Sequence, residues 1–143
     1  MEQSFAQRVG SSQVATKSPF LQEGEHTLKI KALKVTGKTP KGRFFVAEFE
    51  VIASTVHRVG SAVSWAPNLD SPYSDGDVKS IKRLIGVAIG IDHNDKNFNN
   101  EVTAEIVDQA VSDEQPLLGK VVLDTAYMNP NRTYTKHAWR CAE

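Results

Sequence analysis

The sequence predicts a mainly β protein: a five-stranded barrel with one helix between its third and fourth strands and a second, short helix after it. Three observations carry this prediction. Three segments with alternating apolar and polar residues follow one another between residues 26 and 65, as β-strands do. One segment then has apolar residues at helical spacing, and two more strand-like segments complete the chain.

The first three strands are expected at His26–Val35, Arg43–Ser54 and Val59–Trp65, separated by short polar connections. The alternation of the first strand slips at Ala32 and Leu33, and one extra residue there predicts a β-bulge that bends the strand. One face of the second strand should be buried because its apolar residues alternate. That face carries Phe45, Ala47, Phe49 and Val51.

The segment Asp77–Ile91 has the clearest helical pattern in the chain. Asp75 and Asp77 are candidate N-caps, and Gly90 is a stop signal. Apolar residues at helical spacing should form one buried stripe on this helix. The stripe consists of Val78, Ile81, Leu84, Ile85, Ala88 and Ile89.

The rest of the chain supplies a second helix and two strands. Residues 92–100 are expected to form a loop, and Thr103 should cap a short helix at Ala104–Val111. The last two strands are expected at Lys120–Met128 and Thr133–Arg140. This order of elements is that of the OB-fold, a five-stranded Greek-key barrel. An open α+β sheet uses the same elements and stays an alternative.

Length and composition fit one globular domain. The 143 residues divide into an extended or flexible N-terminal arm, residues 1–18, and a domain of residues 19–143. The end of the arm, through Leu21, is expected to pack on the domain. The single cysteine, Cys141, excludes an internal disulfide framework, and we expect no metal or other cofactor. Polar residues at the N-terminus and the absence of a long apolar run predict a cytoplasmic protein without a membrane segment.

Charge is unevenly distributed although the formal net charge is zero. Residues 25–91 carry ten Lys and Arg against six Asp and Glu, and residues 115–143 carry four against two. Residues 92–114 carry one against seven, so the strands are mildly basic and one connecting segment is acidic. An uneven distribution of this kind matters more for a binding surface than the total charge does. Ordinary solvated strand faces would give the same pattern.

Basic and aromatic residues together suggest binding of single-stranded nucleic acid, because cations bind phosphates and rings stack on bases. Three rings are interpreted as stacking platforms: Phe44, Tyr73 and Tyr134. Trp65 fits a stacking role and a core position equally well. The remaining large rings are expected in the core: Phe45, Phe49 and Trp139. The candidate nucleic-acid-binding residues are Lys29, Lys31, Lys34, Lys38, Lys41, Arg43, Phe44, Arg58, Trp65, Tyr73, Arg132, Tyr134 and Lys136.

Several segments have a familiar pattern of apolar residues and glycines: 42–51 with Ser54, 59–65 with the helix after it, 119–123 and 134–139. In these segments the sequence resembles small phage-encoded single-stranded-DNA-binding proteins of the OB-fold type, over about residue 18 to the end. The resemblance implies sequence-independent binding of single-stranded DNA in replication or recombination, in the host cytoplasm. Bacterial-type single-strand binders often end in a flexible acidic tail that recruits replication enzymes. We expect no recruitment by that route here, because residues 139–143 are not an acidic run.

We therefore expect a non-enzymatic protein whose partner is single-stranded DNA. No paired histidines, nucleophile motif or phosphate-binding loop points to catalysis. Replication or recombination proteins and a second copy of the chain are further candidate partners. Two alternatives stay open: a protein-interaction or structural module, such as a phage assembly or host-inhibiting protein, and an oligosaccharide binder that uses rings such as Trp65 and Tyr73.

Overall fold

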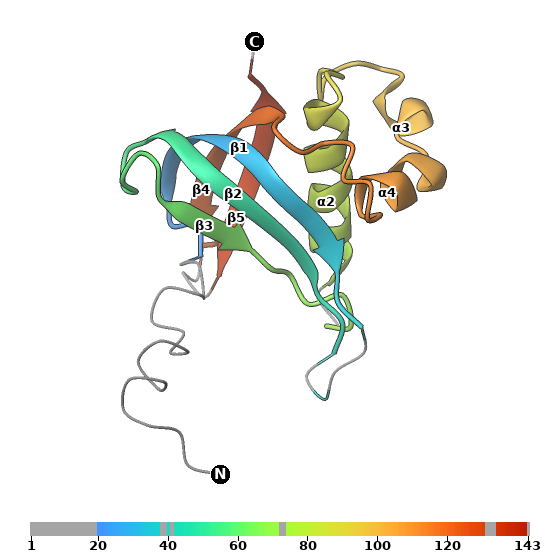
Figure 1. Ribbon diagram of the computed structural model, residues 1–143, viewed down its shortest axis with the longest axis horizontal. Coiled ribbons are helices and arrows are strands. Elements are labelled where there is room, and N and C mark those ends of the chain that lie inside the picture. Colours follow the sequence, from blue (N-terminus) through green and yellow to red (C-terminus); the bar gives the residue numbers. More distant parts are fainter. Residues whose placement is uncertain (1–19, 38–39, 41, 72–73, 131–133, 143) are drawn as a thin grey trace.

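The structure, a computed structural model, describes residues 20–37, 40, 42–71, 74–130 and 134–142. Five strands form one antiparallel sheet with the order β3-β2-β1-β4-β5 (Figure 1). The predicted strands are all present, although β3 begins three residues later than expected. The strands are β1 (Gly24–Val35), β2 (Phe45–Ser54), β3 (Ala62–Trp65), β4 (Val121–Met128) and β5 (Thr135–Cys141).

The β-bulge predicted in β1 is confirmed. Ile30 pairs with Phe49 and Ala32 pairs with Glu48, so Lys31 is the extra residue, one position before the predicted slip. A bulge of this kind increases the local twist and bends the strand. A second register shift lies near the start of β1, where the alternation gave no sign of it.

Helix α2 (Ser74–Ala88) lies between β3 and β4 in the chain and contacts both β4 and β5. It begins three residues before the predicted start. Asp75 and Asp77 therefore lie in its first turn and are not its N-caps, which corrects the expectation. Gly90 has a φ of 95°, a left-handed conformation that suits glycine, so the predicted stop signal is confirmed.

Two short helices follow on the far side of α2 (Figure 1). The prediction of a loop over residues 92–100 was wrong at its end, because α3 (Phe98–Glu101) begins there. Phe98 is buried against Gly86 of α2, where only a residue without Cβ leaves room for its ring. Helix α4 (Ala104–Ala110) has the predicted cap, since the Thr103 side chain accepts a hydrogen bond from the Ile106 amide at 3.3 Å.

The core lies between the inner face of the sheet and α2. The four apolar residues expected on the inner face of β2 are at most 1% exposed. Four of the six stripe residues of α2 are buried as predicted, whereas Val78 and Ile89, at the two ends of the stripe, are exposed. The large rings of Phe45, Phe49 and Trp139 are buried in the core, as expected.

The connection between α4 and β4 docks on the second half of β1, beyond the last residue that β4 pairs with. The side-chain amide of Gln115 accepts a hydrogen bond from the Leu33 amide at 2.8 Å and donates one to the Leu33 carbonyl at 2.7 Å. It also donates to the Ser112 carbonyl at 2.8 Å. One side chain thus replaces a strand partner for Leu33, whose backbone groups would otherwise lose their bonds.

Candidate nucleic-acid interface

A groove of about 840 Å³ opens between the two edge strands of the sheet, β3 and β5. We call it the β3–β5 groove. Its lining comes from the segment before β1, the end of β3, the β3–α2 connection, the first turns of α2, and the β4–β5 hairpin. Segments from five parts of the chain therefore meet here. The aromatic residues of the lining are Phe20, Trp65, Tyr127, Tyr134 and His137.

Tyr134 lies at the rim of the groove, and 55% of its surface is exposed. Asn129 fixes its backbone from both sides: its side-chain oxygen accepts from the Tyr134 amide at 3.0 Å, and its amide donates to the Tyr134 carbonyl at 3.1 Å. The Lys136 ammonium lies 5.8 Å from the centre of the Tyr134 ring. The hairpin therefore presents an aromatic ring and a cation together, on a fixed backbone.

The floor of the groove is a cluster of packed rings. The Trp65 ring lies 5.2 Å from that of His137 and 5.3 Å from that of Trp139, measured between ring centres. Trp65 is only 8% exposed, so it offers a ligand no open stacking face. Trp139 is further fixed by its indole N–H, which donates to the Ser80 hydroxyl of α2 at 3.0 Å.

A buried carboxylate holds His137, one of the rings of this floor. Its Nδ1 lies 2.6 Å from Asp124 Oδ2, and both side chains are almost fully buried. Asp124 Oδ1 is buried and has no hydrogen-bond partner among the described residues. The bond to Asp124 fixes the orientation of the imidazole.

The side of the groove formed by α2 is acidic. Asp75 and Asp77 of its first turn are part of the lining. Burial raises the pKa of the Asp77 carboxyl, an effect that the nearby His137 partly opposes. Because carboxylates repel phosphates, we expect a polyanion to keep its backbone away from this side.

The opposite wall comes from the segment that precedes β1. Leu21 is buried, and its amide donates to the Ser64 carbonyl of β3 at 3.0 Å, so this residue packs on the domain as expected. Ser18 and Pro19, expected to pack with it, lie outside the described residues. Phe20 forms a parallel bridge with Ser64. Two thirds of its surface, 66%, is exposed. The groove lining therefore contains three exposed rings, those of Phe20, Tyr127 and Tyr134.

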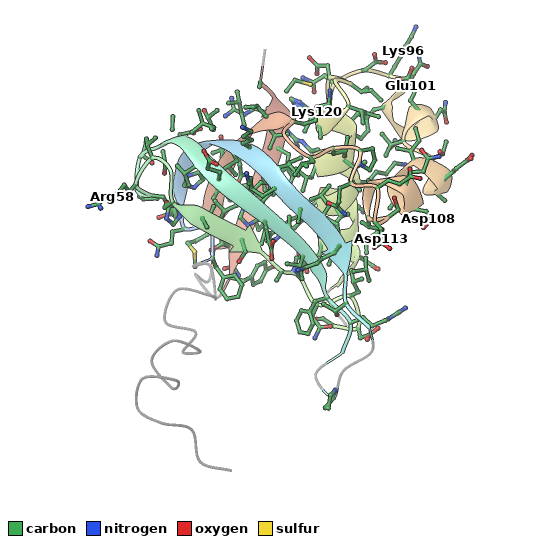
Figure 2. The ribbon with its side chains drawn as sticks, in the orientation of Figure 1. Arg58, Lys96, Glu101, Asp108, Asp113 and Lys120 are labelled. Atoms are coloured by element: carbon green, nitrogen blue, oxygen red, sulfur yellow. The ribbon has the colours of Figure 1, made fainter. Side chains whose placement is uncertain are left out.

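Three of the candidate binding residues line the groove: Trp65, Tyr134 and Lys136. Phe44 lies outside it, half-buried, and bridges to Asn68 of the β3–α2 connection. Arg58 is on the exposed β2–β3 connection, at the opposite end of the molecule from Lys96 (Figure 2). The candidates outside the described residues are Lys38, Lys41, Tyr73 and Arg132.

Three of the described basic candidates, Lys31 and Lys34 of β1 and Arg43 just before β2, face carboxylates. Lys31 lies 3.8 Å from Glu50, and Lys34 lies 3.3 Å from Glu48. Arg43 contacts Asp70 with a side-chain distance of 3.3 Å. Lys29 lies on β1, half-buried. The surplus of cations seen in the sequence is therefore partly neutralised across the strands.

Sequence reasoning did not select the other groove residues, Phe20, Tyr127, His137 and the two aspartates of α2. One signal was available for His137, because alternation places it on the same face of the last strand as Trp139. The others come together only through the tertiary fold.

The chain matches no protein-family model, and no curated protein shows significant similarity to it. Within the described part of the chain, no helix is long and apolar enough to cross a membrane. The same residues contain no group of three or more His, Cys, Asp or Glu side chains that could hold a metal ion.

Proposed function

We propose that the protein binds single-stranded DNA without sequence preference, and that the β3–β5 groove is its binding site. The observation that carries this proposal is the exposed Tyr134 ring with the Lys136 ammonium beside it, in a groove that the exposed Phe20 ring also lines. Rings that stack on bases and cations that follow the backbone are the two components of single-strand binding. The protein acts by binding alone and catalyses no reaction.

The proposal includes an OB-fold barrel. The sheet order β3-β2-β1-β4-β5 and the contact of Trp65 on β3 with two rings of β5 support a sheet that curls toward closure. The bulge in β1 supplies the bend that such a curl needs. In an OB-fold, ligands bind on the face of strands two and three and on the loops between strands one and two and between strands four and five. The groove adjoins the end of β3 and the β4–β5 hairpin.

The charges of the groove suggest how a strand of DNA lies in it. Its phosphates follow the β5 side, where Lys136 lies, and its bases turn toward the rings. The acidic turn of α2 stays free of phosphate because of Asp75 and Asp77. On this proposal the protein acts in DNA replication or recombination in the cytoplasm of a host cell, which is the role that the resemblance to phage single-strand binders implies.

A fluorescence titration with labelled oligo-dT at two salt concentrations tests the proposal. Affinity should fall at the higher salt, because bound phosphates release counterions. Phe20→Ala and Tyr134→Ala should each weaken binding by about 5- to 150-fold, which corresponds to about 1–3 kcal/mol per stacked base. Val59→Ala, at an exposed apolar residue outside the groove lining, is the matched control and should bind like the wild type. Unchanged affinity in both ring variants would refute this site.

One observation favours a second candidate, a protein-interaction module. The Tyr134 carbonyl accepts from the amide of Asn129, the residue that follows β4, and the Trp139 carbonyl accepts from Arg83 of α2 at 2.6 Å. Because successive residues of a strand point to opposite sides, Thr135 and His137 direct their backbone groups away from β4, toward the groove. An extended peptide could pair with that edge. Failure to bind oligo-dT at low salt would favour this candidate, and Thr135→Pro would then block pairing without disturbing the bonds to β4.

A further inference from the structure

Two histidine rings hold the backbone of one residue, Gln22, just before β1. The Gln22 amide donates to Nε2 of His57 at 3.1 Å. The Gln22 carbonyl lies 2.8 Å from Nε2 of His26. The two imidazole rings lie 5.3 Å apart. We call Gln22, His26 and His57 the Gln22 clamp.

Hydrogen bonds around Ser54 determine which nitrogens carry protons. The Ser54 hydroxyl oxygen accepts from the amides of Val56 at 3.0 Å and His57 at 2.9 Å. Its own proton is then available to His26 Nδ1, which lies 2.8 Å away. His26 therefore carries its proton on Nε2 and donates it to the Gln22 carbonyl. His57 accepts at Nε2, which only an imidazole without a proton on that atom can do.

The clamp lies directly after the segment that forms one wall of the groove. Phe20 and Leu21 are attached to β3 at Ser64, and Gln22 is the next residue along the chain. Beyond the clamp, the Glu25 amide and carbonyl both bond to Thr55 at 3.0 Å, so the chain is firmly held from there on. Loss of the clamp would thus leave the short segment Phe20–Gln22 with fewer attachments than the strand that follows it.

We propose that the Gln22 clamp is a pH-sensitive latch: protonation of His57 breaks its bond to Gln22 and releases the segment Phe20–Gln22 from β3. A protonated His57 would direct an N–H at the Gln22 N–H, so an attraction becomes a repulsion. A proton on His26 Nδ1 would likewise face a hydroxyl that already accepts two bonds. The two rings, once charged, would also repel each other across 5.3 Å.

The charged groups around the clamp do not compensate for a proton on His57. Glu25 and Arg140, which share a cavity with His26, pair with each other at 3.1 Å. The Glu23 carboxylate accepts from the Met128 amide at 3.3 Å. Arg58, next in sequence to His57, adds positive charge. Burial, and after it the nearby His26, lower the pKa of His57 from the ordinary value of 6.5.

The sign of the pH dependence follows from this lowered pKa. The released segment leaves His57 with its ordinary pKa, near 6.5, whereas the latched state has a lower one. The latch is therefore fully closed above pH 6.5 and loses stability as the pH falls toward the pKa of the latched state. Because one proton is taken up, the equilibrium between the latched and released states shifts by up to tenfold per pH unit between these two pKa values.

Amide hydrogen exchange on the free protein tests the latch. The Leu21 amide, which bonds to Ser64, should lose up to tenfold of its protection factor per pH unit between pH 6.5 and 5, after correction for intrinsic exchange rates. His57→Gln keeps an acceptor that does not titrate, so its Leu21 protection should stay constant. His93→Gln, at a half-buried histidine in the α2–α3 loop, is the matched control and should behave like the wild type.

Constant protection of Leu21 in the wild type, or an equal loss in His57→Gln, would overturn the proposal. If His57→Gln disturbs folding, a nuclear magnetic resonance titration of the His57 ring in the wild type takes the place of that variant. An apparent pKa of His57 at or above 6.5 would overturn the proposal. No DNA is present in either measurement, so the latch and the proposed function can fail separately. If both hold, oligo-dT affinity should fall on acidification in the wild type more than in His57→Gln, because Phe20 leaves the groove.

Discussion

The Gln115 side chain attaches β1 directly to the connection between α4 and β4. Its amide makes three hydrogen bonds to backbone groups, two of them to Leu33. Each bond contributes about 0.5–1.5 kcal/mol net, so we expect Gln115→Ala to lower the free energy of unfolding by about 2–4 kcal/mol. Backbone strain does not enter this estimate, because glutamine and alanine bear the same cost at the φ of 46° found here.

A second substitution separates hydrogen bonding from packing. Gln115→Glu keeps the size and the acceptor for the Leu33 amide but places a carboxylate oxygen where the NH₂ group donated to two carbonyls. It should cost at least as much as alanine at pH 7, and less at pH 4, where the protonated acid can donate again. Gln109→Ala, at an exposed position on α4, is the control and should stay within about 0.5 kcal/mol of the wild type.

Urea denaturation followed by circular dichroism measures all three variants. The expected result is a lower midpoint with an unchanged slope for both Gln115 variants, because the same surface is exposed on unfolding. A loss below about 0.5 kcal/mol for Gln115→Ala would mean that water replaces the amide without cost. The inference that one side chain acts as a strand partner for β1 would then be wrong.

Two further predictions concern packing and charge. Gly86→Ala would place a Cβ 2.2 Å from the Phe98 ring, so it should destabilise the protein by about 1–3 kcal/mol despite the better helix propensity of alanine. Thermal unfolding measures this change, and a higher melting temperature would contradict the prediction. Glu48→Gln together with Glu50→Gln removes the carboxylates that face Lys34 and Lys31, so oligo-dT should bind more tightly and with a steeper salt dependence if the outer face of the sheet takes part. Unchanged affinity would confine binding to the groove.

Local patterns predicted the strands well because burial of one sheet face imposes a period of two on the sequence. The inner face of β2 was predicted from alternation alone, and the bulge in β1 was visible because Leu33 takes up the apolar phase one residue late. The second register shift of β1 left no such trace. At this shift β2 contains one extra residue, Ile52, which is exposed. An exposed position accepts polar and apolar residues alike, so the alternation does not reveal the shift.

The elements that were missed depend on contacts between distant parts of the chain. Helix α3 has only four residues, and its position follows from Phe98 entering the space beside Gly86. No local signal near residue 98 reveals a missing side chain at residue 86. The early start of α2 is a different case, because acidic residues are favourable both at an N-cap and throughout the first helical turn.

The sequence predicted the kinds of residue in the candidate site better than it predicted which of them lie together. Tyr134 and Lys136 were selected because a ring can stack on a base and a cation can bind a phosphate, and both line the groove. Lys31 and Lys34 of β1 were selected by the same reasoning, yet they face glutamates. Cross-strand register decides which charges meet, and a count of charges along the sequence does not contain it.

The positions of the charged residues explain how a protein with zero net charge can have the proposed function. Exposed carboxylates gather on the helical side, where Glu101 and Asp108 extend from α3 and α4 (Figure 2). Strand cations are matched by neighbouring carboxylates, and exposed pairs of this kind are worth at most about 1 kcal/mol, so a phosphate can displace a carboxylate from them at little cost. Affinity for DNA would then depend on the rings of the groove for most of its free energy. We therefore expect a weaker salt dependence than a strongly basic protein of this size would show, and a larger loss from Tyr134→Ala than from removal of any one lysine.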